Sequence, residues 1–149
     1  MRTLHGKHWH PAMHEAAHWF VFSKLGGSGF IAVEIHIGQK VGSIMLFNYG
    51  RIHPQEELID ALSSLAGPVC DHILLDKAPG KCGDMQSAKR WLRTNEELAL
   101  AWNRVEGYLY NHWSTLESIA NTLIVNRNKQ GIVSKRKLQK IAHTFKLGT

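Results

Sequence analysis

The chain has 149 residues, of which 44% are hydrophobic and 20% are charged, the size and composition of one globular domain with its own core. No apolar run approaches the roughly 18–20 residues of a membrane span, and the N-terminus lacks the apolar segment of a secretory signal. Two cysteines, Cys70 and Cys82, are too few for a disulfide scaffold, so we expect a cytoplasmic protein.

The net charge of +6 is unevenly distributed along the chain. No acidic residue follows Glu117, whereas seven cationic residues do: Arg127, Lys129, Lys135, Arg136, Lys137, Lys140 and Lys146. Such a segment is compatible with a nucleic acid or an acidic protein as partner. No helix-turn-helix, zinc-finger or RNP pattern accompanies it, and a solvated helix face is the simpler interpretation.

The first predicted helix begins at Pro11, because proline suits the first turn of a helix. Apolar residues recur at helical spacing up to about Leu25, and the sequence GGSG at 26–29 ends the helix. We expect residues 1–10 to be a flexible N-terminal segment. Two β-rich runs, around 30–38 and 41–47, predict a hairpin or two adjacent strands.

A second helix is predicted over about 55–75, where apolar residues again recur at helical spacing. It contains Gly67 and Pro68, and two interpretations fit this pair: Pro68 bends the helix, or Gly67 allows close packing against a neighbour. A short helix over about 84–92 follows. Asp84 is its predicted N-cap, since aspartate accepts hydrogen bonds from free amide groups at a helix start.

The C-terminal third is predicted to be helical. Apolar residues at spacings of three and four indicate one long amphipathic helix over 95–125. Ser134 is a plausible cap for a final basic helix over 135–145. There is no internal repeat and no linker long enough to separate two domains. We therefore predict a single α+β domain over residues 1–149, mainly helical, with one small sheet.

The sequence HEAAH at 14–18 matches the HExxH pattern of zinc peptidases. Residues i and i+4 of a helix lie on one face, so His14 and His18 could offer two imidazole nitrogens to one zinc ion. Glu15 projects about 100° around the axis from His14, where it could take a proton from a zinc-bound water. A shuffled chain of this composition would contain the motif in roughly 3–4% of cases. Surface or structural histidines are therefore the alternative.

A catalytic zinc ion needs a third protein ligand and an open position for water. Residues 19–24 read WFVFSK, so no HExxHxxGxxH continuation supplies that ligand. The candidates further along the chain are Glu56, Glu57, Asp71, His72, Cys82 and Asp84. Chemistry alone leaves Asp71, His72 and Asp84 nearly equal.

From HEAAH onward the sequence resembles the protease domain of FtsH-type ATP-dependent zinc metalloproteases. Their metal helix reads HEAGH, and the pattern of their next strands is similar to VEIHIGQKVGSIML. The stretch LAGPVCDH at 65–72 resembles their LAGRxAEE-like segment, and GDMQSAK at 83–89 resembles their NDLxxAT segment, whose Asp is the third zinc ligand. The predicted long helix, short turn and final helix also match. The resemblance covers about residues 10–145.

This resemblance implies a zinc site and a general base. His14, His18 and Asp84 would bind Zn²⁺, and Glu15 would be the catalytic base. Asp71 matches the first acidic residue of the family's AEE and would orient a ligand histidine from behind. The alternative for Asp71 is an exposed helical carboxylate without such a role.

The sequence departs from the family at several points. Ala17 replaces the glycine of HEAGH, and His72 replaces the second acidic residue of AEE. The chain has no GxxxxGK[ST] phosphate loop and no membrane anchor, both of which family members carry. We expect a stand-alone domain, phage, prophage or bacterial, that cleaves flexible or unfolded segments unless a separate ATPase or adaptor delivers the substrate.

Together these features predict a zincin-like metal helix followed by a small sheet and a helical bundle, with zinc-dependent endopeptidase activity. The peptide would lie extended along the strand residues Val41, Gly42, Ser43, Ile44 and Met45. A homo-oligomer is compatible with the resemblance, because family members form rings. The alternatives are a structural zinc without turnover, or a non-catalytic protein that binds a protein or nucleic acid through its basic C-terminal helix.

Overall fold

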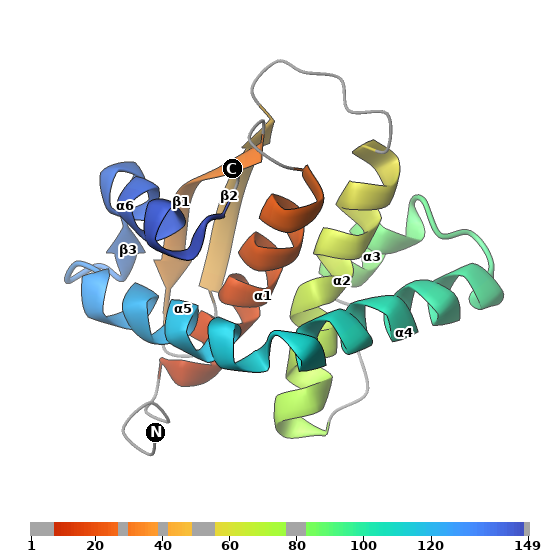
Figure 1. Cartoon of the computed structure of the whole chain (residues 1–149). Helices are drawn as coiled ribbons and strands as arrows, with labels where there is room; N and C mark the ends of the chain where they lie inside the picture. The colour runs from red at the N-terminus through yellow and green to blue at the C-terminus, as the bar shows by residue number, and fades with distance from the viewer. Residues whose placement is uncertain (1–7, 27–29, 39–41, 49–55, 77–82, 148–149) are drawn as a thin grey trace.

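The computed structural model of the chain describes residues 8–26, 30–38, 42–48, 56–76 and 83–147. Within these ranges six helices and three strands form a mainly helical α+β fold with one small antiparallel sheet (Figure 1). The predicted fold class is therefore confirmed at this level. The helix in the centre packs between one helix on one side and the sheet on the other, with a second helix across it.

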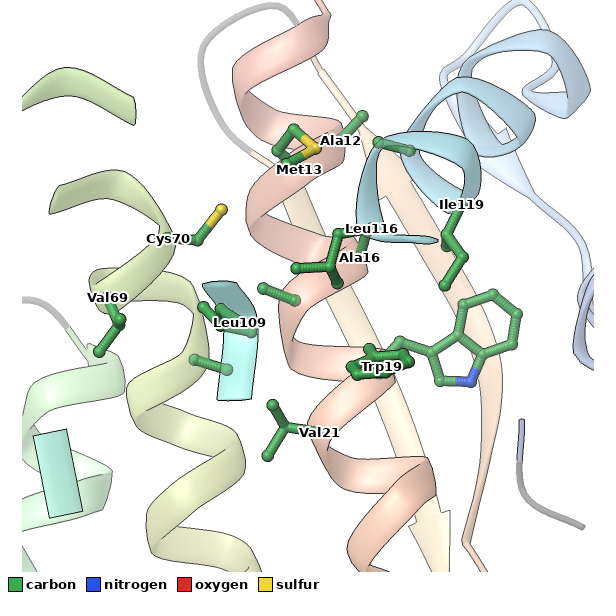
Figure 2. Packing of buried hydrophobic residues seen from close by; sticks show 14 of the residues in the cluster. Ala12, Met13, Ala16, Trp19, Val21, Val69, Cys70, Leu109, Leu116 and Ile119 are labelled. Carbon is green, nitrogen blue, oxygen red and sulfur yellow. The ribbon is translucent and has the colours of Figure 1, made fainter. Parts of the chain in front are cut away.

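The central helix is α1 (Trp9–Gly26), which packs against α2 (Glu56–Leu75), α5 (Trp113–Asn126) and the sheet. Most of its residues are buried, as expected of a helix that is apolar on nearly every side. Figure 2 shows Ala12 and Ala16 at places where neighbouring elements come close. Small side chains at these positions allow the helices to approach, and Trp19 fills the wider space beside them.

The sheet has the strand order β2-β1-β3. β1 (Phe30–Ile37) and β2 (Gly42–Asn48) form the predicted antiparallel pair, with an irregularity in register between Ala32 and Glu34. β3 (Ile132–Val133) adds to the other side of β1. This strand was not predicted, because two residues are too few to show a period. β2 is consequently an outer strand of the three.

A glycine makes the β1–β3 contact possible. Gly131 has a φ of +84°, and its carbonyl accepts a 2.7 Å hydrogen bond from the Ile37 amide. A Cβ atom at Gly131 would lie 2.6 Å from the Ile37 carbonyl oxygen. Any other residue would therefore clash with β1 as well as strain its own backbone.

The predicted helix over 95–125 is wrong as a single element. The chain forms α4 (Asn95–Asn111) and α5, separated at His112, whose φ of −122° and ψ of 20° are not helical. His112 Nδ1 donates to the carbonyl oxygen of Tyr108 at 2.9 Å. Before the break α4 packs on α2, and after it α5 packs on α1.

Two other predicted elements have different boundaries. Trp9 and His10 belong to α1 and Trp9 is buried, so the prediction of a flexible segment through residue 10 is wrong for these two; residues 1–7 lie outside the described part. α3 (Gly83–Lys89) ends before Leu92. Asp84 lies in its first turn, so the prediction that Asp84 is the N-cap is wrong.

The final helix agrees with its prediction. α6 (Lys135–Phe145) begins after Ser134, whose hydroxyl accepts a hydrogen bond from the Lys137 amide. Leu138 and Ile141 are its buried residues. The other side of α6 is exposed and polar.

Among the described helices, α2 alone is long and apolar enough to cross a membrane by length and composition. Within the fold, 56% of its 18-residue apolar window is buried. Leu62, Leu65 and Val69 belong to the hydrophobic core. A core helix with one fully packed side has the same composition.

We predict that the contact between α5 and α1 supplies much of the stability of the fold. Leu116 of α5 is fully buried in it, so Leu116→Ala should lower the free energy of unfolding by about 2–5 kcal/mol. Val125 lies in the same helix and is 73% exposed, so Val125→Ala should change it by less than about 0.5 kcal/mol. Urea unfolding measures both, and equal effects would contradict this packing.

Candidate metal centre

Three potential ligand atoms meet between α1, α2 and α3. His14 Nε2 lies 3.1 Å from His18 Nε2, and Asp84 Oδ2 lies 3.1 Å from the first and 3.0 Å from the second. The histidines are four residues apart on α1, and Asp84 comes from the first turn of α3. The structure thus brings together the three residues that the sequence analysis named as zinc ligands.

Each imidazole is held from behind through its other ring nitrogen. His18 Nδ1 donates to the carbonyl oxygen of Ser63 at 2.6 Å. His14 Nδ1 lies 3.0 Å from both carboxylate oxygens of Asp71. Because a carbonyl or a carboxylate oxygen accepts, these partners keep a proton on Nδ1. Both rings then direct Nε2 toward Asp84, as metal-binding histidines do.

The histidines occupy space that only glycine leaves open. A Cβ atom on Gly67 of α2 would lie 2.4 Å from Nε2 of both His14 and His18. Of the two interpretations of the Gly67-Pro68 pair, close packing at Gly67 is therefore confirmed. The absent side chain lets the two rings lie directly over the α2 backbone.

Asp71 contacts a second histidine as well. His10 Nε2 donates to Asp71 Oδ1 at 2.6 Å. His10, His14 and His18 follow one another at intervals of four residues, so all three project from one side of α1. This spacing was the available sequence signal for His10, which the prediction of a flexible N-terminal segment missed.

Glu15 lies near the two histidine ligands. Its carboxylate and the ring nitrogens of His14 and His18 lie within 4.8 Å of one another. Glu15 is only 3% exposed. Burial raises the pKa of its carboxyl group, although the charges of His18 and His14 act in the opposite direction. A carboxylate with a raised pKa accepts and returns a proton more readily near neutral pH.

The acidic partners govern the protonation of the histidine site. Burial alone would lower the pKa of His14, but the hydrogen bonds to Asp71 and Asp84 and the charge of Glu15 raise it from 6.5 to about 10. Burial would raise the pKa of Asp71 and Asp84, yet the hydrogen bonds from the histidines hold each pKa below its ordinary value. In this arrangement the carboxylates are ionised and His14 carries an extra proton.

The donor set fits a zinc ion. Two ligands of a tetrahedral zinc ion, with bonds of about 2.0–2.1 Å, lie about 3.3–3.4 Å apart. The three ligand atoms here are 3.0–3.1 Å apart, so a movement of a few tenths of an ångström would suffice. Two imidazoles and one carboxylate also leave a fourth position open, as in catalytic zinc sites.

Other predicted residues lie elsewhere or outside the described part. Gly42, Ser43, Ile44 and Met45 belong to β2, where they pair with β1 from Ile37 to Glu34; Val41 and Cys82 lie outside the described residues. The ring of His72 lies 5.8 Å from that of Trp102 on α4. It therefore belongs to the α2–α4 contact, and the three-atom site does not include it.

One group that orients a ligand histidine could not be predicted from the sequence. The carbonyl group of Ser63 holds His18, and a backbone carbonyl is present at every residue.

No protein-family model matches the chain, and a search of curated proteins finds no match. The resemblance to FtsH-type proteases therefore rests on the motifs and their order.

We predict that Gly67→Ala disrupts the site and the α1–α2 contact together. The new methyl group would overlap both imidazoles, so the free energy of unfolding of the chelator-treated protein should fall by about 1–3 kcal/mol. Gly107→Ala is the matched control, because a Cβ atom there meets nothing within 4 Å and alanine should favour α4 by up to about 1 kcal/mol. Parental stability of Gly67→Ala in urea would contradict the close approach.

We also predict a pH dependence for the metal-free protein. Because the pKa of His14 rises from 6.5 to about 10 in the folded state, the folded chain holds an extra proton between these values. Its stabilising contribution is complete below about pH 6.5 and is lost as the pH rises to about 10. Urea unfolding with chelator at several pH values measures this slope. His14→Gln should flatten it, and the same slope in that variant would exclude His14 as its source.

Proposed function

We propose that the chain is a zinc-dependent endopeptidase with a zincin-like metal helix. One observation carries this proposal: the Nε2 atoms of His14 and His18 and a carboxylate oxygen of Asp84 converge, with the buried Glu15 near the two histidines. The order of elements, with a metal helix, a strand pair, a second helix and a third-ligand helix, supports the resemblance to FtsH-type protease domains.

Each residue has a distinct part in the proposed hydrolysis. When bound, zinc would lower the pKa of a coordinated water and polarise the scissile carbonyl group. His14, His18 and Asp84 would hold the ion, while Asp71 and the Ser63 carbonyl keep the rings oriented. Glu15 would take the proton of the attacking water and deliver it to the leaving amine. Its position next to the ligands on α1 suits both transfers.

The substrate would be an extended peptide. β2 is an outer strand of the sheet, and its backbone from Gly42 to Met45 pairs on one side with β1. A peptide can add to the other side of such a strand through main-chain hydrogen bonds. We propose flexible or unfolded segments as substrates, because a segment that is packed inside a folded protein is not free to extend along β2. A cytoplasmic setting, a homo-oligomer and a separate ATPase or adaptor belong to the same proposal.

We predict that zinc binding and hydrolysis can be separated by substitution. Glu15→Gln should keep one zinc per chain but lower casein cleavage by at least about 100-fold, the usual effect of losing a general base. Asp84→Ala should lose stoichiometric zinc, because two imidazoles remain of three ligands. Metal analysis and a chelator-sensitive casein assay measure both effects.

Glu57→Gln is the matched control, since Glu57 is an exposed carboxylate at the start of α2. It should leave both zinc content and cleavage unchanged. Parental cleavage by Glu15→Gln would contradict the assignment of the base. A zinc-containing chain that cleaves nothing and unfolds with chelator would instead indicate a structural metal.

A further inference from the structure

A cationic surface lies apart from the metal centre, on α6 and the segment before it. Its members are the seven cations that follow Glu117: Arg127, Lys129, Lys135, Arg136, Lys137, Lys140 and Lys146. All but Arg127, which is half-buried, are exposed. We call these residues the basic surface. In Figure 1, α6 lies beside β1, on the opposite side of α1 from α2 and α3.

The cations of α6 are placed where they weaken the helix. Arg136 and Lys140 are four residues apart on one face, and like charges at this spacing are unfavourable. The first turn has no acidic residue, although the positive end of the helix dipole favours one there. By contrast, α4 has Glu96 and Glu97 in its first turn. Helix stability therefore does not explain the charges of α6.

The basic surface continues into a cavity at the segment between α5 and β3. Lys137 Nζ donates to the Asn126 carbonyl oxygen at 2.9 Å, which holds the start of α6 against the end of α5. A cavity of about 800 Å³ adjoins this segment, and Arg127, Lys129 and Gln130 are among its lining residues. No carboxylate is among the described residues that line it. Two cations, Arg127 and Lys129, therefore line a recess in addition to those on the helix face.

The composition of this surface favours phosphates over other anionic partners. Leu138, Ile141 and Leu147 are at most 4% exposed, so α6 has no apolar face to insert into a membrane. Protein interfaces usually contain a buried apolar or aromatic centre. Among the described residues that line the cavity, Val125 is the one exposed apolar side chain, and a single valine is too small to form such a centre. A phosphodiester backbone needs only closely spaced cations and hydrogen-bond donors.

The same surface favours a duplex over a single strand. Binding of single strands relies on exposed aromatic side chains on which bases stack. Residues 126–147 are all described, and the one Phe, Tyr or Trp among them, Phe145, packs against the core. An exposed helix with cations along one face instead matches the paired backbones that border a DNA groove.

We propose that the basic surface binds the phosphate backbone of double-stranded DNA without sequence preference. Arg136 and Lys140 form its centre, because they lie opposite the buried residues of α6. The site is independent of the proposed peptidase: it includes none of the metal-centre residues, and binding should persist with chelator present.

The test is fluorescence anisotropy with a labelled 20-base-pair duplex of arbitrary sequence, in low salt and with chelator. The full chain should bind, and its affinity should fall as salt is raised. Arg136→Gln/Lys140→Gln should weaken binding at least about tenfold and reduce the slope of log affinity against log salt by about 1.8, or 0.9 for each lost phosphate contact. Circular dichroism should show unchanged helix content.

Lys89→Gln/Arg93→Gln is the matched control. Both residues are exposed on the α3–α4 side, and the substitutions remove the same charge, so duplex affinity should change less than about twofold. Equal losses in both double variants would show a net-charge effect and overturn the proposal. So would undetectable duplex binding, or tighter binding of the corresponding single strand or of polyglutamate.

Discussion

The candidate site depends on the close approach of two helices at Gly67. Nε2 of both His14 and His18 would lie 2.4 Å from a Cβ atom at that position, so the rings rest on bare backbone. The same approach brings the Ser63 carbonyl to one ring and Asp71 to the other. α2 therefore supplies both the space and the orientation, while α1 supplies the ligands. Asp84 then needs only a short helix to reach the rings.

Sequence periodicity was sufficient to predict the long helices. It was insufficient where tertiary contacts determine where an element begins or ends. The helices around 11–25 and 55–75 were predictable because their apolar residues recur at helical spacing, and the helix over 135–145 was predictable from its cap, Ser134. The break at His112 was not, since apolar residues continue through it at the same spacing. The two helices on either side of the break pack on different partners, which apolar spacing does not reveal. β3 was missed because two residues carry no period.

The candidate site also combines residues that the sequence predicts with groups that only the fold brings together. His14, Glu15 and His18 are local in sequence, so one motif and the geometry of a helix bring them together. Asp84 is 66 residues beyond His18; residue chemistry left it tied with others, and only its resemblance to a family motif favoured it. The Ser63 carbonyl could not be foreseen, because a backbone group becomes a partner only once two helices are placed.

The extra proton on His14 has a consequence for how the site would be filled. With its pKa raised to about 10, His14 holds a positive charge between the carboxylates of Asp71 and Asp84. That proton balances buried negative charge which would otherwise oppose folding. An entering metal ion would have to displace it, so loading would be an exchange of one cation for another. Acidity would then compete directly with metal uptake.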